Sequence, residues 1–206
     1  PFGEIPIEDL ERGDMVKTLD HGTKPIRWIG HRKLSAEDLA KAPEMRPIRI
    51  EARSMGGGLP KSDLIVSPQH RLFIRSRIAK RMFGKEEVLI AAKHLLGVPG
   101  VSVVEDSNGV EYWHFLFDQH EIVFAECIPS ESLYTGQEAL KTLSEKSRAE
   151  IFTLFPELAD LDHDGLKVDC PSPMGARIFP KGPEARELAK RHVKNHKALW
   201  ASECFV

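Results

Sequence analysis

The sequence predicts a mainly β fold followed by a C-terminal helical extension. As far as residue 125, apolar residues come in short runs or alternate with polar ones, and turn residues such as Gly, Pro, Asn and Asp separate the runs. Beyond Gly136 the sequence is rich in strong helix formers, with apolar residues three and four positions apart. We therefore expect a β domain over residues 1–136 and a helical extension over residues 137–206 that packs on it.

Nine strands are expected in the β domain. Each is an alternating or continuous apolar run, rich in β-branched and aromatic residues and bounded by turn residues. They cover residues 14–19, 25–33, 47–51, 62–66, 71–75, 87–91, 101–105, 110–117 and 121–125. Ser107-Asn108-Gly109 predicts a hairpin turn between residues 101–105 and 110–117, because Asn-Gly tolerates the positive backbone angles of tight hairpins.

Helices are expected at one place in the β domain and at three places after it. A short helix over residues 36–42 would have Ser35 as its N-cap and Asp38 in its first turn. In the extension, helix formers cover residues 137–143, 145–155 and 184–200, and a segment rich in Pro and Gly covers residues 160–183.

Composition narrows the possible functions. The 206 residues are 41% hydrophobic and 29% charged with a formal net charge of −2, which suits one or at most two compact domains and lacks the basic excess of a nucleic-acid-binding protein. No apolar run approaches the roughly twenty residues that cross a bilayer, so membrane insertion is not expected. Cys127, Cys170 and Cys204 are too widely spaced for a zinc cluster and predict no disulfide framework. We expect a monomer without a metal or cofactor.

A hydroxyl and an imidazole lie three residues apart in Ser67-Pro68-Gln69-His70, between two predicted strands. Pro68 biases Ser67 toward extended backbone and cannot donate to a sheet ladder, so the strand bends or ends there and displays both polar side chains. The pattern indicates either an active-site corner or an ordinary connection between two strands.

This corner resembles the Thr-x-x-His block of the Hint family, the self-cleaving domain shared by hedgehog proteins and inteins, with Ser67 where Thr is usual. The runs that carry further similarity, in order, are residues 3–18, 24–32, 91–95, 117–125 and 129–132. They are similar to the bacterial Hint domains of secreted, repeat-rich, hemolysin-type proteins. The resemblance covers residues 1 to about 136 and implies a Hint fold and a secreted protein.

The resemblance also implies self-processing. In Hint proteins an N-terminal Cys attacks the preceding carbonyl and forms a thioester, which a second nucleophile resolves. His70 would then protonate the departing amide nitrogen, and Ser67 would hydrogen-bond the distorted peptide or the developing oxyanion. His120 would help activate the second nucleophile or support the site, although a strand-end histidine that is hydrogen-bonded for structure is the favoured explanation. Asp118 would orient a nearby imidazole, or it is an ordinary aspartate before a turn. The substrate would be the protein's own upstream polypeptide.

Two departures from the family qualify this expectation. The sequence enters at Pro1-Phe2-Gly3, downstream of the Cys block, so these residues alone should be inert. The His-Asn ending of inteins is replaced by Cys127-Ile128-Pro129, which favours cleavage over splicing. The alternative function is that of a degenerate, noncatalytic Hint domain that serves as a binding or surface-display module of a secreted protein.

Three further patterns are explained by ordinary structural roles and not by ligand binding. Asp160, Asp162 and Asp164 match the first half of a calcium loop, but Pro171 stands where a bidentate Glu belongs, so we favour a solvated acidic turn over a calcium-stabilised β domain. His192 and His196 are spaced for a metal, yet the lysines around them indicate an exposed basic face. Gly56-Gly57-Gly58 is interpreted as a flexible connection.

Overall fold

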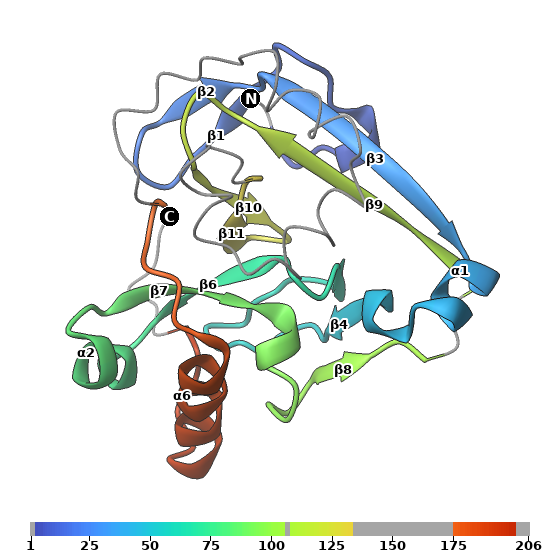
Figure 1. Ribbon diagram of the computed structural model, residues 1–206. Helices are drawn as coiled ribbons and strands as arrows, with labels where there is room; N and C mark the ends of the chain where they lie inside the picture. Colours follow the sequence, from blue (N-terminus) through green and yellow to red (C-terminus); the bar gives the residue numbers. More distant parts are fainter. Residues whose placement is uncertain (1–2, 106–107, 134–174, 201–206) are drawn as a thin grey trace.

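The computed structural model describes residues 3–105, 108–133 and 175–200 of the chain, and it confirms a mainly β architecture (Figure 1). The predicted helices over residues 137–143 and 145–155, the acidic run at Asp160, Cys170 and Cys204 lie outside the described residues. None of the helices within the described ranges is long and apolar enough to cross a membrane.

The described strands form four antiparallel sheets. A long ribbon runs across the upper part of Figure 1 and pairs eight residues on each side. The sheets are β1 (Met15–Lys17) with β2 (Thr23–Pro25); the ribbon β3 (Trp28–Ser35) with β9 (Gly109–Leu116); β5 (Leu64–Val66), β4 (Ile48–Ile50) and β8 (Val101–Val103); and β10 (Ile122–Ala125), β11 (Ile128–Glu131), β6 (Arg71–Arg75) and β7 (Glu87–Ala91).

The helical elements are α1 (Ala36–Lys41), α2 (Arg77–Phe83), α6 (Gly182–Lys194) and the short 3-10 turns η1 (Ile7–Asp9), η2 (Pro43–Met45) and η3 (Ala92–His94). The predicted cap of α1 is confirmed, because the Asp38 backbone N–H donates to Ser35 Oγ over 3.2 Å and the Asp38 carboxylate accepts from the Ser35 N–H over 2.9 Å. Sequence reasoning missed α2, in which Ser76 Oγ accepts from the Ala79 N–H over 3.0 Å.

Two strand predictions need correction. The expected strand over residues 25–33 is divided at Ile26 and Arg27, where the chain changes partner: the Ile26 N–H donates to the Asp14 carbonyl beside β1, and the Arg27 N–H donates to the Leu116 carbonyl of β9. The expected hairpin between β8 and β9 is wrong, since β8 pairs with β4 and β9 pairs with β3. Gly109 pairs with Ser35 instead, at a φ of +130°, and a Cβ there would lie 2.8 Å from the Leu34 carbonyl oxygen.

The largest core lies between the sheets of β4 and β6 and helix α6. Its fully buried members include Ile50, Ile74, Leu95 and Leu188, so α6 packs on the same core as the strands. The predicted helix over residues 184–200 stops at Lys194, and the chain then crosses back until Trp200 packs against Phe73 on β6.

The three-glycine connection is a packed turn, contrary to the flexible connection expected from the sequence. The Trp200 backbone N–H donates to the Met55 carbonyl over 2.9 Å. At Gly56, which has a φ of +106°, a Cβ would lie 2.4 Å from the Ala198 Cβ and 2.7 Å from the Trp200 carbonyl oxygen. Glycine therefore allows the chain after α6 to close against this turn.

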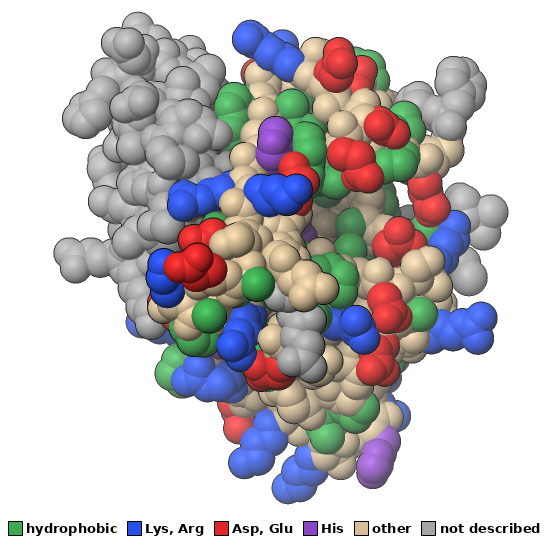
Figure 2. Space-filling view, turned by 90° about the vertical axis from the view of Figure 1, so that its right-hand side faces the viewer, with side chains coloured by type: hydrophobic (Ala, Val, Ile, Leu, Met, Phe, Trp, Pro, Cys, Tyr) green, Lys and Arg blue, Asp and Glu red, His purple; other side chains and the backbone are tan. Residues whose placement is uncertain are grey.

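The face drawn in Figure 2 carries Lys, Arg, Asp and Glu side chains interspersed.

Candidate active site

The turn of residues 67–70 is held between β5 and β6. The His70 N–H donates to the Ser67 carbonyl over 3.1 Å, and the carbonyls of His70 and Pro68 accept from the N–H groups of Ala92 and Lys93 over 2.9 and 3.0 Å. The backbone of the turn is therefore fixed by one hydrogen bond within the turn and by two donors from η3. Ser67 is 4% exposed, so its hydroxyl lies in the interior of the protein.

His70 lies against a second imidazole, that of His114 on β9. The two ring centroids are 5.5 Å apart. His70 as a residue is partly exposed, but within the described part of the chain its Nε2 is buried without a hydrogen-bond partner. Burial lowers the pKa of His70, Arg71 acts in the same direction and Glu131 opposes them. Burial and the neighbouring His70 lower the pKa of His114 to about 3.

Arg71, the residue after His70, forms a buried ion pair with Glu131. The Arg71 backbone N–H donates to Glu131 Oε1 over 2.8 Å, and the Arg71 guanidinium donates to the two carboxylate oxygens over 3.3 and 3.0 Å. Burial alone would raise the pKa of Glu131, but Arg71, His120 and His70 together hold it well below its usual range. Glu131 is therefore a carboxylate with its counterion in place.

His120 completes the group. It is 7% exposed, and its Nε2 lies 3.6 Å from Glu131 Oε2. Its Nδ1 accepts the backbone N–H of Ala176 over 3.0 Å, and its ring centroid lies 5.8 Å from that of Phe179. Phe179 also stacks on Arg71, whose guanidinium carbon is 4.4 Å from the ring centroid.

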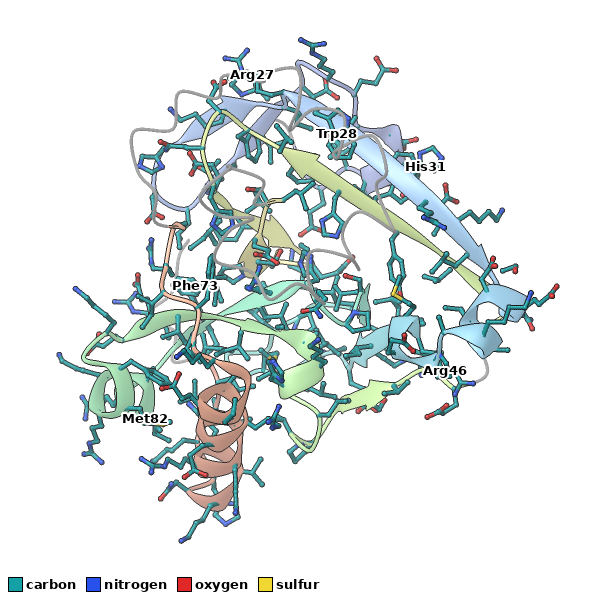
Figure 3. All side chains as sticks on the ribbon, in the orientation of Figure 1. Arg27, Trp28, His31, Arg46, Phe73 and Met82 are labelled. Atoms are coloured by element: carbon teal, nitrogen blue, oxygen red, sulfur yellow. The ribbon has the colours of Figure 1, made fainter. Side chains whose placement is uncertain are left out.

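The structure thus brings two of the residues singled out in the sequence, His70 and His120, close to Glu131, and it joins Ser67 to His70 through the backbone of the turn. Asp118 is not part of the group. It is exposed and binds Arg27, with Oδ2 and Nη2 2.7 Å apart. Figure 3 shows Arg27 at the top of the molecule, far from Phe73 on β6.

Sequence reasoning missed His114, Arg71, Glu131 and residues 176–179. His114 shares the inward face of β9 with the buried Tyr112 and Leu116, and this alternation is visible in the sequence. No sequence signal joins Arg71 to Glu131, which is 60 positions away.

Cys127 and His192 lie apart from this group. The Cys127 thiol donates to Glu4 Oε1 over 2.8 Å, and burial followed by Glu4 raises its pKa, so it is poorly suited as a nucleophile. The exposed face expected for His192 is wrong, because this side chain is buried. Its Nδ1 donates to the Lys197 carbonyl over 3.1 Å and its Nε2 accepts from Ser76 Oγ over 2.9 Å. The described residues contain no group of three His, Cys, Asp or Glu side chains suited to hold a metal.

A family model described as the Hint domain matches residues 1–137. The chain belongs to the Hint domain family. The match includes the turn of residues 67–70, the His114 strand, His120 and Glu131, and it ends before Ala176 and Phe179. No curated protein and no solved structure matches the chain. The Hint domain is a self-processing type of domain, and His70, His114 and His120 lie within the matched region.

Proposed function

We propose that this Hint domain cleaves its own polypeptide at the peptide bond that precedes a nucleophilic Cys at the front of the domain. The thiol sulfur would attack the carbonyl carbon of that bond, a C–S bond would form, and the C–N bond would break as the amide nitrogen gains a proton. Water or an added thiol would then attack the thioester carbonyl and release the upstream chain. Nucleophilic catalysis of this kind divides one difficult step into two easier ones.

The observation that carries this proposal is the buried Nε2 of His70, which has no hydrogen-bond partner among the residues that the structure describes. Since the pKa of His70 is lowered, the imidazole is neutral at pH 7 and has an unoccupied nitrogen. A neutral imidazole in this position would accept the proton of the attacking thiol and return it to the departing amide nitrogen. One group would then supply both proton transfers without a net change of charge.

Ser67 would act on the oxygen of the reacting peptide. Ser67 is 4% exposed, and its backbone is fixed by the turn that contains His70. A hydroxyl on this fixed backbone would donate to an oxyanion, a capacity that Ser shares with the Thr of the family's block.

His120 would support the site rather than transfer protons. Its Nδ1 accepts the Ala176 N–H, and its Nε2 faces Glu131. We further propose that the substrate is the domain's own upstream polypeptide, that the domain acts as a monomer without a cofactor, and that it belongs to a secreted bacterial protein, as the sequence resemblance implies.

The test joins a reporter protein to Pro1 through a Hint opening block, a Cys followed by a Gly-Thr turn and a short strand. Because Cys127 is engaged by Glu4, the added Cys supplies the nucleophile. We expect added thiol to accelerate release of the reporter, detected by gel and mass analysis. His70→Ala should slow release about 10² to 10⁴-fold, and Ser67→Ala about 10² to 10³-fold.

His31→Ala is the matched control, because His31 lies on β3 with about half of its side chain exposed. It should release the reporter at the unchanged rate. A fusion that stays intact in every condition, while the domain keeps its cooperative unfolding transition, would overturn the proposal and favour a noncatalytic binding or display module.

A further inference from the structure

We infer that residues 175–179, which lie outside the Hint family match, position His120 of the candidate site by fixing which of its ring nitrogens carries the proton. We call these residues the covering segment. The inference concerns the state of His120, and only its effect on cleavage rests on the proposed function. It makes part of the C-terminal extension a working component of the self-processing site.

The covering segment is anchored beside β7. The Leu89 N–H donates to the Ile178 carbonyl over 3.1 Å, and residue 178 forms a parallel bridge with Val88. Arg177 donates from Nε to Glu87 Oε2 over 2.5 Å and from its terminal nitrogens to both Asp20 carboxylate oxygens over 2.9 Å. These bonds hold the residues next to His120 in one place.

The contact with His120 has a defined direction. A backbone N–H can only donate, so His120 Nδ1, 3.0 Å from the Ala176 nitrogen, must be the acceptor. The neutral ring then carries its proton on Nε2, which lies 3.6 Å from Glu131 Oε2. The covering segment therefore turns a donor toward the carboxylate that also binds Arg71.

Phe179 covers the same group from the side. Its ring lies over the Arg71 guanidinium at 4.4 Å and 5.8 Å from the His120 ring. An aromatic face in this place keeps water from the ion pair of Arg71 and Glu131 and strengthens the interactions inside it.

Gly175 shows how closely the parts fit. A Cβ at this position would lie 2.3 Å from Phe179 Cζ and 3.2 Å from His120 Nδ1. Any side chain at position 175 must displace the Phe179 ring or the His120 ring, so a single methyl group is enough to disturb the arrangement.

The experiment compares Gly175→Ala and Phe179→Leu with Ile178→Ala in the full chain carrying the reporter fusion. Ile178 is 39% exposed, and its contact with β7 is made by its backbone, which makes it a matched control within the covering segment. Nitrogen-15 NMR of the imidazole rings reports which nitrogen of His120 is protonated, and it does so whether or not cleavage occurs. Urea unfolding identifies any variant that fails to fold, in which case the other one decides.

We expect the unchanged chain and Ile178→Ala to show a protonated Nε2 and an unprotonated Nδ1 at His120. Gly175→Ala and Phe179→Leu should show a mixture of the two tautomers, with release of the reporter slowed roughly 10 to 100-fold, because a displacement of about 1 Å costs about this much. A protonated Nδ1 in the unchanged chain, or an unaltered tautomer in both folded variants, would overturn the inference.

The two proposals fail separately. If no fusion releases the reporter, the proposed function fails, while the NMR signals still decide whether the covering segment sets the tautomer. If the fusion is active and both variants change the tautomer but keep the full rate, the positioning role fails and the self-processing function stands.

Discussion

The buried site has a neutral half, formed by two histidines, and a charged half, formed by an ion pair. His70 and His114 face each other, and burial lowers the pKa of both, so each is neutral at pH 7. On the other side, Arg71 and Glu131 keep full charges, because each has the other as a counterion. At the two histidines burial outweighs the attraction of Glu131, whereas at Glu131 the Arg71 guanidinium and the neighbouring histidines together outweigh burial and preserve the charge.

We expect the neutral half to transfer protons and the charged half to hold the site in position. A group that moves protons needs an unoccupied nitrogen and a pKa that its surroundings can shift, which describes His70. A paired and hydrogen-bonded ion holds its position, which describes Glu131 between Arg71 and His120. We therefore expect substitutions in the charged half to act on stability and substitutions in the neutral half to act on pH dependence and rate.

The largest effect is expected from Glu131→Gln. The substitution leaves the Arg71 guanidinium, whose side chain is 14% exposed, without its counterion. The free energy of unfolding, measured by urea denaturation, should fall by about 3–5 kcal/mol. Glu111→Gln, at a more exposed contact with His31, should change it by less than about 0.5 kcal/mol. Equal effects of the two substitutions would contradict the assigned role of the buried pair.

The next effect is on the pH dependence of stability. The pKa of His114 is about 3 in the folded protein and near its ordinary value of 6.5 in the unfolded chain, so below pH 6.5 the unfolded state binds more protons. Its contribution to stability is present above pH 6.5 and is lost as the pH falls toward 3. Each pH unit in this window should cost about 1.4 kcal/mol for this one group.

His114→Asn tests this window between pH 6.5 and 4.5, above the range where Glu131 titrates. The free energy of unfolding of the variant should fall less steeply with decreasing pH than that of the unchanged chain, by about 1.4 kcal/mol per pH unit. His31→Asn, on the exposed side of β3, serves as the control and should keep the original slope. Parallel curves for all three proteins would show that His114 is not neutral in the fold.

The smallest effect is expected from Ser67→Thr, which places the family's usual residue in the turn. The hydroxyl is retained and one methyl group is added at a residue that is 4% exposed. Release of the reporter should change by less than about tenfold, in contrast to the loss of about 10² to 10³-fold expected for Ser67→Ala. Similar losses in both variants would mean that the fit of the side chain, and not its hydroxyl, matters at this position.

Local patterns predicted the parts of the fold that local interactions determine. The capped helix α1 and the strands flanking the turn of residues 67–70 were expected from neighbouring residues. The break at Ile26 and the pairing of β9 with β3 were not, because they depend on partners far away in the sequence. The strand β11 contains Pro129 and two polar residues, so its pattern does not indicate a buried strand.

The candidate site divides in the same way. Ser67, His70 and His120 were found from short motifs and a resemblance, and their roles stay predictions. Their surroundings could not be found, since the Glu131 carboxylate reaches Arg71 and the Ala176 N–H reaches His120 only after the strands and the covering segment are in place. His192 shows the opposite error, because basic neighbours suggested exposure while tertiary packing buries it.

Ala176 and Phe179 lie late in the sequence, so they are synthesised after the other residues of the candidate site. Residues 67–131 leave the ribosome first, and in that interval His120 has neither the amide donor nor the aromatic ring that surround it in the folded molecule. The last described helix and the covering segment arrive afterwards and close over β6 and β7. Synthesis thereby delays completion of the site until most of the domain has been made.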